Sequence, residues 1–441
     1  MVVAEDTYPL HKAAFYNDVD TISTLLENVS GVDIQRQDMH GNTALHISTM
    51  LGHQEATLML LAHNAPVSKK NGDGWNCLIE AVSYGNREII TSMLRKLKAQ
   101  SKQDMLKRKP HLLKVLSEFG DFYLELKWDF HSWIPLLSKV LPSDLCKIYK
   151  RGTSLRLDTT LVDLNDRSFE RGDISFIYNS GTEKKPSRFF ILDNYAKVFQ
   201  RVKNEDIESE IEDEVDLLMS SDMVNVHMST KPITFERTFA GWLFRHEKCE
   251  KVGEYNASFY AVRGMSLVTK KRREHLSAED VKKNKALIKS LAAGSAMLEE
   301  ELKCSSCRES LEPPERTAVT WDEYINALPK EPPRLGRPMV LKQSSKNFNA
   351  FVAMSDEFPL RVDVLLDILE VVAPFKHLSK LRDFCQLRMP PGFPVKIEIP
   401  LLPTITAKVT FQKFAFRNDL TSQMFQVPSY YREDPSRFKD L

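Results

Sequence analysis

The residues best suited to metal or redox chemistry are two cysteines in a C-x-x-C arrangement, Cys304 and Cys307. A structural zinc site needs four ligands, and the sequence holds no second pair at a suitable spacing. A redox motif is expected where a strand turns into a helix, whereas a proline-rich stretch follows here. The chain also lacks the G-x-S-x-G, H-E-x-x-H, Walker and G-x-G-x-x-G motifs. We interpret the thiols as incidental and predict no catalytic residue, no cofactor, no metal ligand and no enzyme activity.

Three charged runs are the next candidates for binding chemistry. Residues 95–110 and the quartet Lys270–Arg273 are basic, and residues 205–222 are acidic. For each run we favour a solvated surface, which for the acidic run is a surface helix or a mobile loop. The alternative for residues 95–110 is a phosphate or acidic-lipid contact, and the alternative for the quartet is a nuclear-import or lipid-contact patch. We expect the first basic run to extend a helix, to stop at Pro110 and to act as a linker.

Composition narrows the class of protein. The chain has 441 residues, 42% hydrophobic and 27% charged, with a net charge of +1 and six cysteines. These values are typical of a globular protein of two or three domains, and they argue against a general nucleic-acid binder. The low cysteine content favours a reducing compartment. We see no signal peptide and no run of ~18 apolar residues, so we expect no membrane span.

Three stretches near the N-terminus repeat one pattern. Residues 38–65 hold a glycine turn, a T-x-L-H start and two apolar helices separated by a second turn. Copies begin at Tyr8 and at Asp73, and Leu45 and Leu78 are 33 residues apart. This motif and period resemble ankyrin repeats. We predict three helix-turn-helix units over residues 7–94, with Leu10 equivalent to the other two leucines and all three buried.

Individual repeat residues have predicted roles. Gly41 supplies the turn, and Thr43 caps the helix that follows. His11 and His46 are interpreted as buried hydrogen-bonding residues that fasten adjacent turns, not as ligands. The second helix of the middle repeat is expected to bury three leucines, which are Leu58, Leu60 and Leu61.

Beyond the repeats, apolar residues alternate with polar ones, which predicts β-strands. In residues 122–130 every second residue is apolar, so we expect these five side chains to face one core. We count about eight strands in hairpin order, including a meander over residues 174–202 and a late strand over 405–412. Helices are expected at 362–372 and 375–387, and residues 311–338 are read as a proline-rich connector.

The predicted fold class is therefore multidomain α plus α+β. A helical repeat stack is followed by a largely antiparallel β-rich domain with helical insertions. We place the repeats at 1–98, a helical linker at 99–120, the β-rich domain at 121–430 and a tail at 431–441.

Several stretches resemble one family across nearly the whole chain. The repeats are followed by Phe122-Tyr-Leu-Glu-Leu-Lys-Trp-Asp-Phe-His-Ser-Trp-Ile-Pro135, and later by Arg171-Gly-Asp-Ile-Ser-Phe-Ile-Tyr178. With the stretches 144–157 and 235–242, these blocks resemble the ankyrin-repeat GPCR-chaperone family, also called the ankyrin repeat domain-containing protein 13 family. Longer members carry C-terminal ubiquitin-interacting motifs. This sequence ends at Leu441 without one, so it resembles the short, C-type member.

The resemblance implies a non-enzymatic chaperone. Such a protein would bind cytosolic segments of newly made G-protein-coupled receptors at the endoplasmic reticulum. It would be cytoplasmic and peripheral on that membrane, and it would regulate receptor biogenesis and exit. Two alternatives remain: a ubiquitin-dependent endocytic adaptor, and a carrier of a lipid or other hydrophobic ligand.

Repeat turns project from the stack, so their tips are candidate protein-binding residues. We predict a receptor-contacting surface made of five turn residues, which are Met39, His40, Asn71, Asp73 and Trp75. Packing between repeats is the alternative role for Trp75.

Overall fold

The computed structural model describes residues 7–28, 31–132, 141–165, 168–180, 188–202, 208–229, 233–241, 246–293, 308–328, 332–372, 389–402 and 405–438. Contacts divide the chain into two compact units, each assembled from three stretches. The first unit, called the repeat unit below, comprises Met1–Leu106, Glu205–Val226 and Thr269–Ser344. The second, called the sheet unit, comprises Lys107–Asn204, His227–Val268 and Ser345–Leu441.

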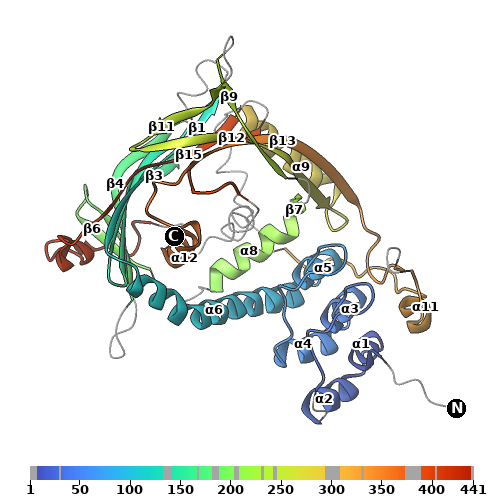
Figure 1. The fold of residues 1–441 in the computed structure, drawn as a ribbon. Helices are drawn as coiled ribbons and strands as arrows, with labels where there is room; N and C mark the ends of the chain where they lie inside the picture. The colour runs from blue at the N-terminus through green and yellow to red at the C-terminus, as the bar shows by residue number, and fades with distance from the viewer. Residues whose placement is uncertain are drawn as a thin grey trace. The chain divides into compact units, whose positions relative to one another are not determined.

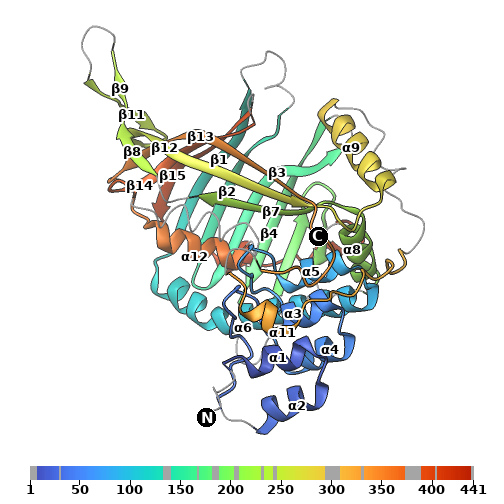
Figure 2. The same cartoon turned by 90° about the vertical axis from the view of Figure 1, so that its right-hand side faces the viewer.

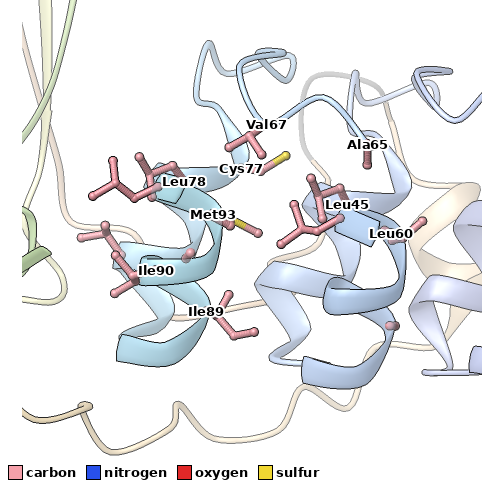
Figure 3. Close-up of a cluster of buried hydrophobic side chains, with 14 of the residues drawn as sticks. Leu45, Leu60, Ala65, Val67, Cys77, Leu78, Ile89, Ile90 and Met93 are labelled. Atoms are coloured by element: carbon pink, nitrogen blue, oxygen red, sulfur yellow. The ribbon is translucent and has the colours of Figure 1, made fainter. Parts of the chain in front are cut away.

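The repeat unit begins with the three predicted helical pairs, visible as the blue to teal helices labelled α1 to α6 in Figure 1. The pairs are α1 (Pro9–Phe15) with α2 (Val19–Asn28), α3 (Ala44–Leu51) with α4 (Gln54–Ala62), and α5 (Cys77–Tyr84) with α6 (Arg87–Glu118). The three leucines predicted to be equivalent are all buried. Figure 3 shows two of them, Leu45 and Leu78, among the side chains that join the second and third repeats. The prediction of three units in register is confirmed.

Local sequence fixes the ends of these helices. Thr43 and Asn76 accept hydrogen bonds from backbone N–H groups three residues later, which caps α3 and α5. Gly52 and Gly85 end the same helices in the left-handed conformation. A side chain at Gly52 would strain the backbone at its positive φ and would also require the Tyr84 ring to move.

Two expectations for these helices, the burial of three leucines in α4 and a helix end at Pro110, are wrong. Leu60 and Leu61 are buried in α4, but Leu58 is 41% exposed, because it points away from the buried side of the helix. Pro110 does not stop α6, which continues to Glu118.

The acidic run forms α8 (Glu208–Ser220), and its assignment to a solvated surface is also wrong. Ile211, Val215 and Met219 share one face and are buried in the same apolar cluster as α5 and the start of α6. The acidic residues of α8 pair with basic residues of α6, including Lys98 with Glu214 at 2.9 Å. Thus α8 covers the last repeat (Figure 1).

The later part of the repeat unit contains α9 (Ala278–Ala293), α11 (Trp321–Ile325) and an extended run to residue 340. Trp321, Tyr324 and Leu335 are buried against Phe15 and Ile47 of the repeats. We call residues 320–328 and 332–340 the strap. Its backbone approaches α3 so closely that a Cβ on Gly336 would lie 2.8 Å from the Met50 carbonyl oxygen. Part of the predicted connector is therefore packed structure.

The sheet unit contains most of one large sheet, whose strands Figure 2 shows side by side. The strands have two to eighteen residues, and β7, β12 and β13 extend into the repeat unit. The described strands are β1 (Phe122–Ser132), β2 (Ser143–Arg151), β3 (Ser154–Asn165), β4 (Ser168–Asn179), β5 (Arg188–Asp193), β6 (Val198–Arg201), β7 (Met223–Ser229), β8 (Thr234–Arg237), β9 (Phe239–Ala240), β10 (His246–Glu247), β11 (Cys249–Val252), β12 (Tyr255–Arg272), β13 (Leu341–Ser355), β14 (Phe393–Leu402), β15 (Ile405–Phe416) and β16 (Arg432–Glu433).

The main path through this sheet is β11-β12-β13-β14-β15-β1-β2-β3-β4-β5-β6-β16, with β7 and β8 paired to β12. The described pairs of neighbouring strands are antiparallel, except for β16 with β6, which is parallel. The antiparallel architecture and the β4-β5-β6 meander are confirmed. The count of about eight strands was too low, since β13 and β14 were not predicted.

One face of the sheet is packed by α12 (Val362–Val372) and the last turns of α6. Leu112, Leu116 and Leu365 meet Phe122 and Phe414 there. The expectation for β1 holds only in part, because Trp128 and Phe130 are merely half-buried while Tyr123, on the other face, is buried. A register shift against β15 after Glu125 interrupts the simple alternation.

Two features lie outside the described residues. These are the Cys304/Cys307 pair and the helix expected at 375–387.

Candidate protein-binding site of the repeat unit

The row of repeat turns is built by side chains that hold their own backbone. Asp38 Oδ1 accepts hydrogen bonds from the backbone N–H groups of His40 and Asn42, both at 2.9 Å. In the next turn Asn71 Oδ1 accepts one from the Trp75 N–H, also at 2.9 Å. The Gly72 N–H donates to the His40 carbonyl at 3.2 Å, which joins the two turns. These bonds fix the backbone from which the candidate residues project.

The motif histidines fasten neighbouring repeats, as predicted. His46 Nδ1 accepts from the Thr43 N–H at 3.2 Å, so Nε2 carries the proton and donates to the Trp75 carbonyl at 3.1 Å. His11 Nε2 makes the equivalent contact with the Asn42 carbonyl at 3.2 Å. Burial lowers the pKa of His46 to about 4, which keeps the imidazole neutral.

The five predicted turn residues have different surroundings. Met39 is 41% exposed, Asp73 is exposed and Asn71 is half-buried. His40 is buried and its Nε2 donates to the Tyr324 carbonyl at 2.8 Å. Trp75 is buried beneath Arg272, whose guanidinium carbon lies 5.2 Å from the ring centroid. Met39, Asn71 and Asp73 are therefore accessible as they stand, while the other two already have partners within the unit.

Arg272 is the centre of a buried ionic network, so the basic quartet is not a solvated face. Its Nη1 and Nη2 atoms donate to the two carboxylate oxygens of Glu80 at 2.9 and 3.0 Å, and its Nε donates to Glu274 at 2.7 Å. Burial alone would raise the pKa of Glu274, but the Arg272 charge and hydrogen bonds from Arg272 and Ser83 hold it below the ordinary value. This network fastens the end of β12 to the third repeat.

Tyr324 ties the strap to the second repeat. Its hydroxyl donates to Asp38 Oδ2 at 2.6 Å and accepts from Asn42 Nδ2 at 2.9 Å. Burial and the Asp38 charge both raise the pKa of Tyr324, so the hydroxyl keeps its proton. The bond to Asp38 also determines the orientation of the Asn42 amide, because the hydroxyl has only one proton to donate.

A cavity of about 290 Å³ lies among these elements, wholly within the repeat unit. The repeats contribute Asn42, Asn71 and Asp73 to its lining, and the strap contributes Tyr324 and residues 332–337. Two of the predicted residues, Asn71 and Asp73, thus border a concave site. The lining carries guanidinium, carboxylate, amide and phenol groups, which suit recognition of a polar ligand more than an apolar one.

Sequence reasoning missed the strap residues of this site. A signal was present, because Thr320 and Glu323 have the spacing of a capping box, and both capping hydrogen bonds form at the start of α11. Trp321 and Tyr324 follow at helical spacing. Nothing local indicated Arg272, whose partner Glu80 is far away in the sequence.

In the part of the chain that the structure describes, no three His, Cys, Asp or Glu side chains gather as they would around a metal ion. Over the same residues, no helix combines the length and apolar character needed to cross a membrane.

Comparison with known proteins agrees with both halves of this architecture. A family model described as "Ankyrin repeats (3 copies)" matches residues 6–104, and one described as "ANKRD13 C-terminal" matches residues 156–439. A Danio rerio protein named ankyrin repeat domain-containing protein 13C is 52% identical over 437 residues, covering 99% of this chain and 88% of the relative. The Homo sapiens protein of that name is 52% identical over 434 residues, covering 98% of this chain and 79% of the relative.

A second type of relative is more distant. The Homo sapiens protein named ankyrin repeat domain-containing protein 13B is 35% identical over 424 residues, covering 92% of this chain and 67% of the relative. The chain is thus more similar to these 13C relatives than to 13B. The chain belongs to the ANKRD13 family, and its repeat unit is an ankyrin-repeat module of the kind used for protein–protein interaction.

Proposed function

We propose that this protein is a non-enzymatic chaperone for newly made G-protein-coupled receptors. It binds cytosolic segments of the receptors at the endoplasmic reticulum and regulates their biogenesis and exit. The observation that carries the proposal is an ankyrin stack, in a member of the ANKRD13 family, in which two of the accessible turn residues, Asn71 and Asp73, border a polar cavity.

The geometry supports a binding role in two ways. Met39 and Asp73 project from turns whose backbone is fixed by hydrogen bonds, so a partner can bind them with little ordering cost. The cavity that Asp73 borders is concave and polar, which suits a peptide segment.

The two alternatives have less support. The acidic stretch around Asp213–Ser221 faintly resembles a ubiquitin-interacting helix, but Val215 and Met219 of that stretch are buried in the repeat core. A lipid carrier would be favoured by a closed barrel. Among the described residues, the path of hydrogen-bonded strands instead runs from β11 to β16 without a pairing between these two end strands.

The direct test is capture of receptors from solubilised endoplasmic reticulum membranes on the full-length protein. Met39→Ala should reduce the receptor recovered several-fold, because it removes an accessible turn side chain. Leu58→Ala is the matched control, since Leu58 is equally exposed at 41% but lies on α4, away from the turns. Failure of the unmodified protein to recover any receptor would contradict the proposal.

The proposed attachment to the membrane is peripheral, through a partner or a basic surface. High salt or alkaline carbonate should therefore release the protein from microsomes. Retention through both washes, measured by immunoblotting of the pellet, would show that the attachment is not peripheral.

A further inference from the structure

The cavity of the repeat unit contains a buried polar atom that lacks a partner. Asn42 is a lining residue and is buried. Its Nδ2 donates to the Tyr324 hydroxyl, and its Oδ1 accepts no hydrogen bond from any described residue. The Tyr324 hydroxyl donates its proton to Asp38, so it can only accept from Asn42. Exchanging the oxygen and nitrogen of the Asn42 amide would therefore break the hydrogen bond between Asn42 and Tyr324. Asn42 Oδ1 therefore needs a donor group, such as an N–H.

The strap side of the cavity carries two guanidinium groups. Arg337 donates to the carbonyls of Ser83 and Tyr84 at 3.0 and 3.2 Å, which places its charge at the C-terminus of α5. Arg334 is exposed, and its Nη1 donates to the Met339 sulfur at 3.5 Å. Among the described residues neither arginine forms an ion pair with a carboxylate.

The carboxylates around the cavity do not neutralise Arg334. Glu80 is bound through both oxygens by Arg272. Glu274 accepts from Arg272 and Ser83, and its second oxygen accepts from the Val340 N–H at 3.2 Å. Asp73 lies at the exposed turn tip, where Lys270 Nζ donates to its backbone carbonyl at 3.0 Å. Arg334 is thus the lining group best placed to receive an added negative charge.

From these contacts, the geometry points to an extended acidic segment of a partner polypeptide as the occupant of the cavity. A carboxylate of the segment meets Arg334, and a main-chain N–H of the segment donates to Asn42 Oδ1. This inference rests on the proposed function, because it states which chemistry the receptor segments must carry.

A polypeptide fits better than an inorganic anion because the site requires both charge and a donor. A lipid phosphodiester could satisfy Arg334, but its phosphate has no proton for Asn42 Oδ1. A free phosphate keeps a proton at neutral pH, but it is a single small group that would have to serve both contacts at once. An acidic peptide supplies a carboxylate and N–H groups together. The volume of about 290 Å³ lies near the lower end of ligand pockets, so it suits a short segment.

The test selects from a library of random octapeptides on the immobilised full-length protein, with no receptor present. Selected peptides should be enriched in Asp and Glu, and their affinity is then measured by fluorescence polarisation. Arg334→Glu should weaken binding at least tenfold, which is the scale expected for losing one charge-assisted contact. Arg334→Lys keeps the charge and should retain most of the affinity.

Arg316→Glu is the matched control, because Arg316 is exposed in the same unit but is not a lining residue. It should leave peptide affinity unchanged. Enrichment without acidic residues, no enrichment at all, or equal losses in Arg334→Glu and Arg316→Glu would each overturn the inference. So would Arg334-dependent binding to phosphatidylserine vesicles in the absence of peptide binding.

The outcome separates this inference from the proposed function. Acidic peptides that require Arg334, combined with failure to capture receptors, would leave the cavity assignment standing and remove the receptor proposal. If receptors are captured and Arg334→Glu does not weaken their binding, the receptor proposal stands and the assignment of the cavity to an acidic segment is wrong.

Discussion

The two ends of the ankyrin stack are finished in different ways. At the first repeat, α2 buries Ile22, while Thr21, Thr24, Glu27 and Asn28 are exposed. At the third repeat, the apolar side of α5 and α6 is covered by Ile211, Val215 and Met219 of α8. The first repeat ends the stack with the polar face of its own helix α2. The third repeat is covered by α8, which lies more than a hundred residues later in the chain.

This difference shows why a repeat motif predicts a stack but not its boundary. A terminal repeat must present a polar outer surface or be covered, because its apolar face has no further neighbour. The covered end makes the third repeat dependent on distant sequence. Four changes, taken from the largest expected effect to the smallest, test this comparison and the contacts that fasten the repeats.

The largest effect is expected from Val215→Asp at the covered end. Val215 is fully buried in the repeat core, so the substitution places an unpaired carboxylate there and should destabilise the repeat unit by more than about 4 kcal/mol. The measurement is urea unfolding. Leu217→Asp is the control on the same helix, since Leu217 is exposed, and it should change stability by less than ~0.5 kcal/mol.

Next in size is Arg272→Ala, which removes the centre of the ionic network at the third repeat. Glu80 and Glu274 would then remain buried without a cation, and such losses typically cost ~3–5 kcal/mol. Arg273→Ala should cost less than about 1 kcal/mol, because its pair with Asp222 is partly exposed. Equal unfolding midpoints for the two variants would show that the network does not fasten the repeats.

A smaller effect is expected from pH, through His46. Its pKa is lowered to about 4 in the folded state, so the unfolded chain binds a proton more readily below pH 6.5. Stability is therefore full above that pH and falls as the pH decreases toward 4. Between pH 7 and 5.5 this one histidine should account for a loss of about 1 kcal/mol. His46→Gln should reduce the pH dependence of the unfolding midpoint, and an unchanged slope would contradict the assignment.

The smallest effect is expected at the self-closed end. Thr24→Asp adds a charge to the exposed face of α2 and should change stability by less than ~0.5 kcal/mol. If Thr24→Asp lowered the free energy of unfolding as much as Val215→Asp does, the first repeat would also be covered, and the two ends of the stack would not differ.

Much of the local structure was predictable, because local patterns determine it. The period of the repeats, the Thr43 cap, the motif histidines and the β4-β5-β6 meander were all read correctly from neighbouring residues. Two features were missed although signals existed. Ile211, Val215 and Met219 have the spacing of an apolar helix face, and Val395, Ile397 and Ile399 alternate along β14.

The candidate site was less predictable, because its contacts join distant residues. Asn71 and Asp73 were found from the turn motif, whereas Arg272 and Arg334 are distant from those turns in sequence. A lone arginine in a basic quartet or a proline-rich stretch has no pattern that identifies its partner. The sequence predicted a solvated charge at Arg272, but the side chain is buried in an ionic network. Only the tertiary contacts of the folded chain show this role. Whether residues 1–98 form a domain independent of the rest stays a prediction.

The most direct test of the central claim, that α8 completes the repeat stack, is hydrogen exchange of the full-length protein followed by mass spectrometry. In Val215→Asp, amides of α5 and of α6 up to residue 106 should lose protection, and should lose more than amides of α1 and α2. Leu217→Asp should leave all of them as in the unmodified protein. Loss confined to residues 208–220, with α5 and α6 still protected, would contradict the claim.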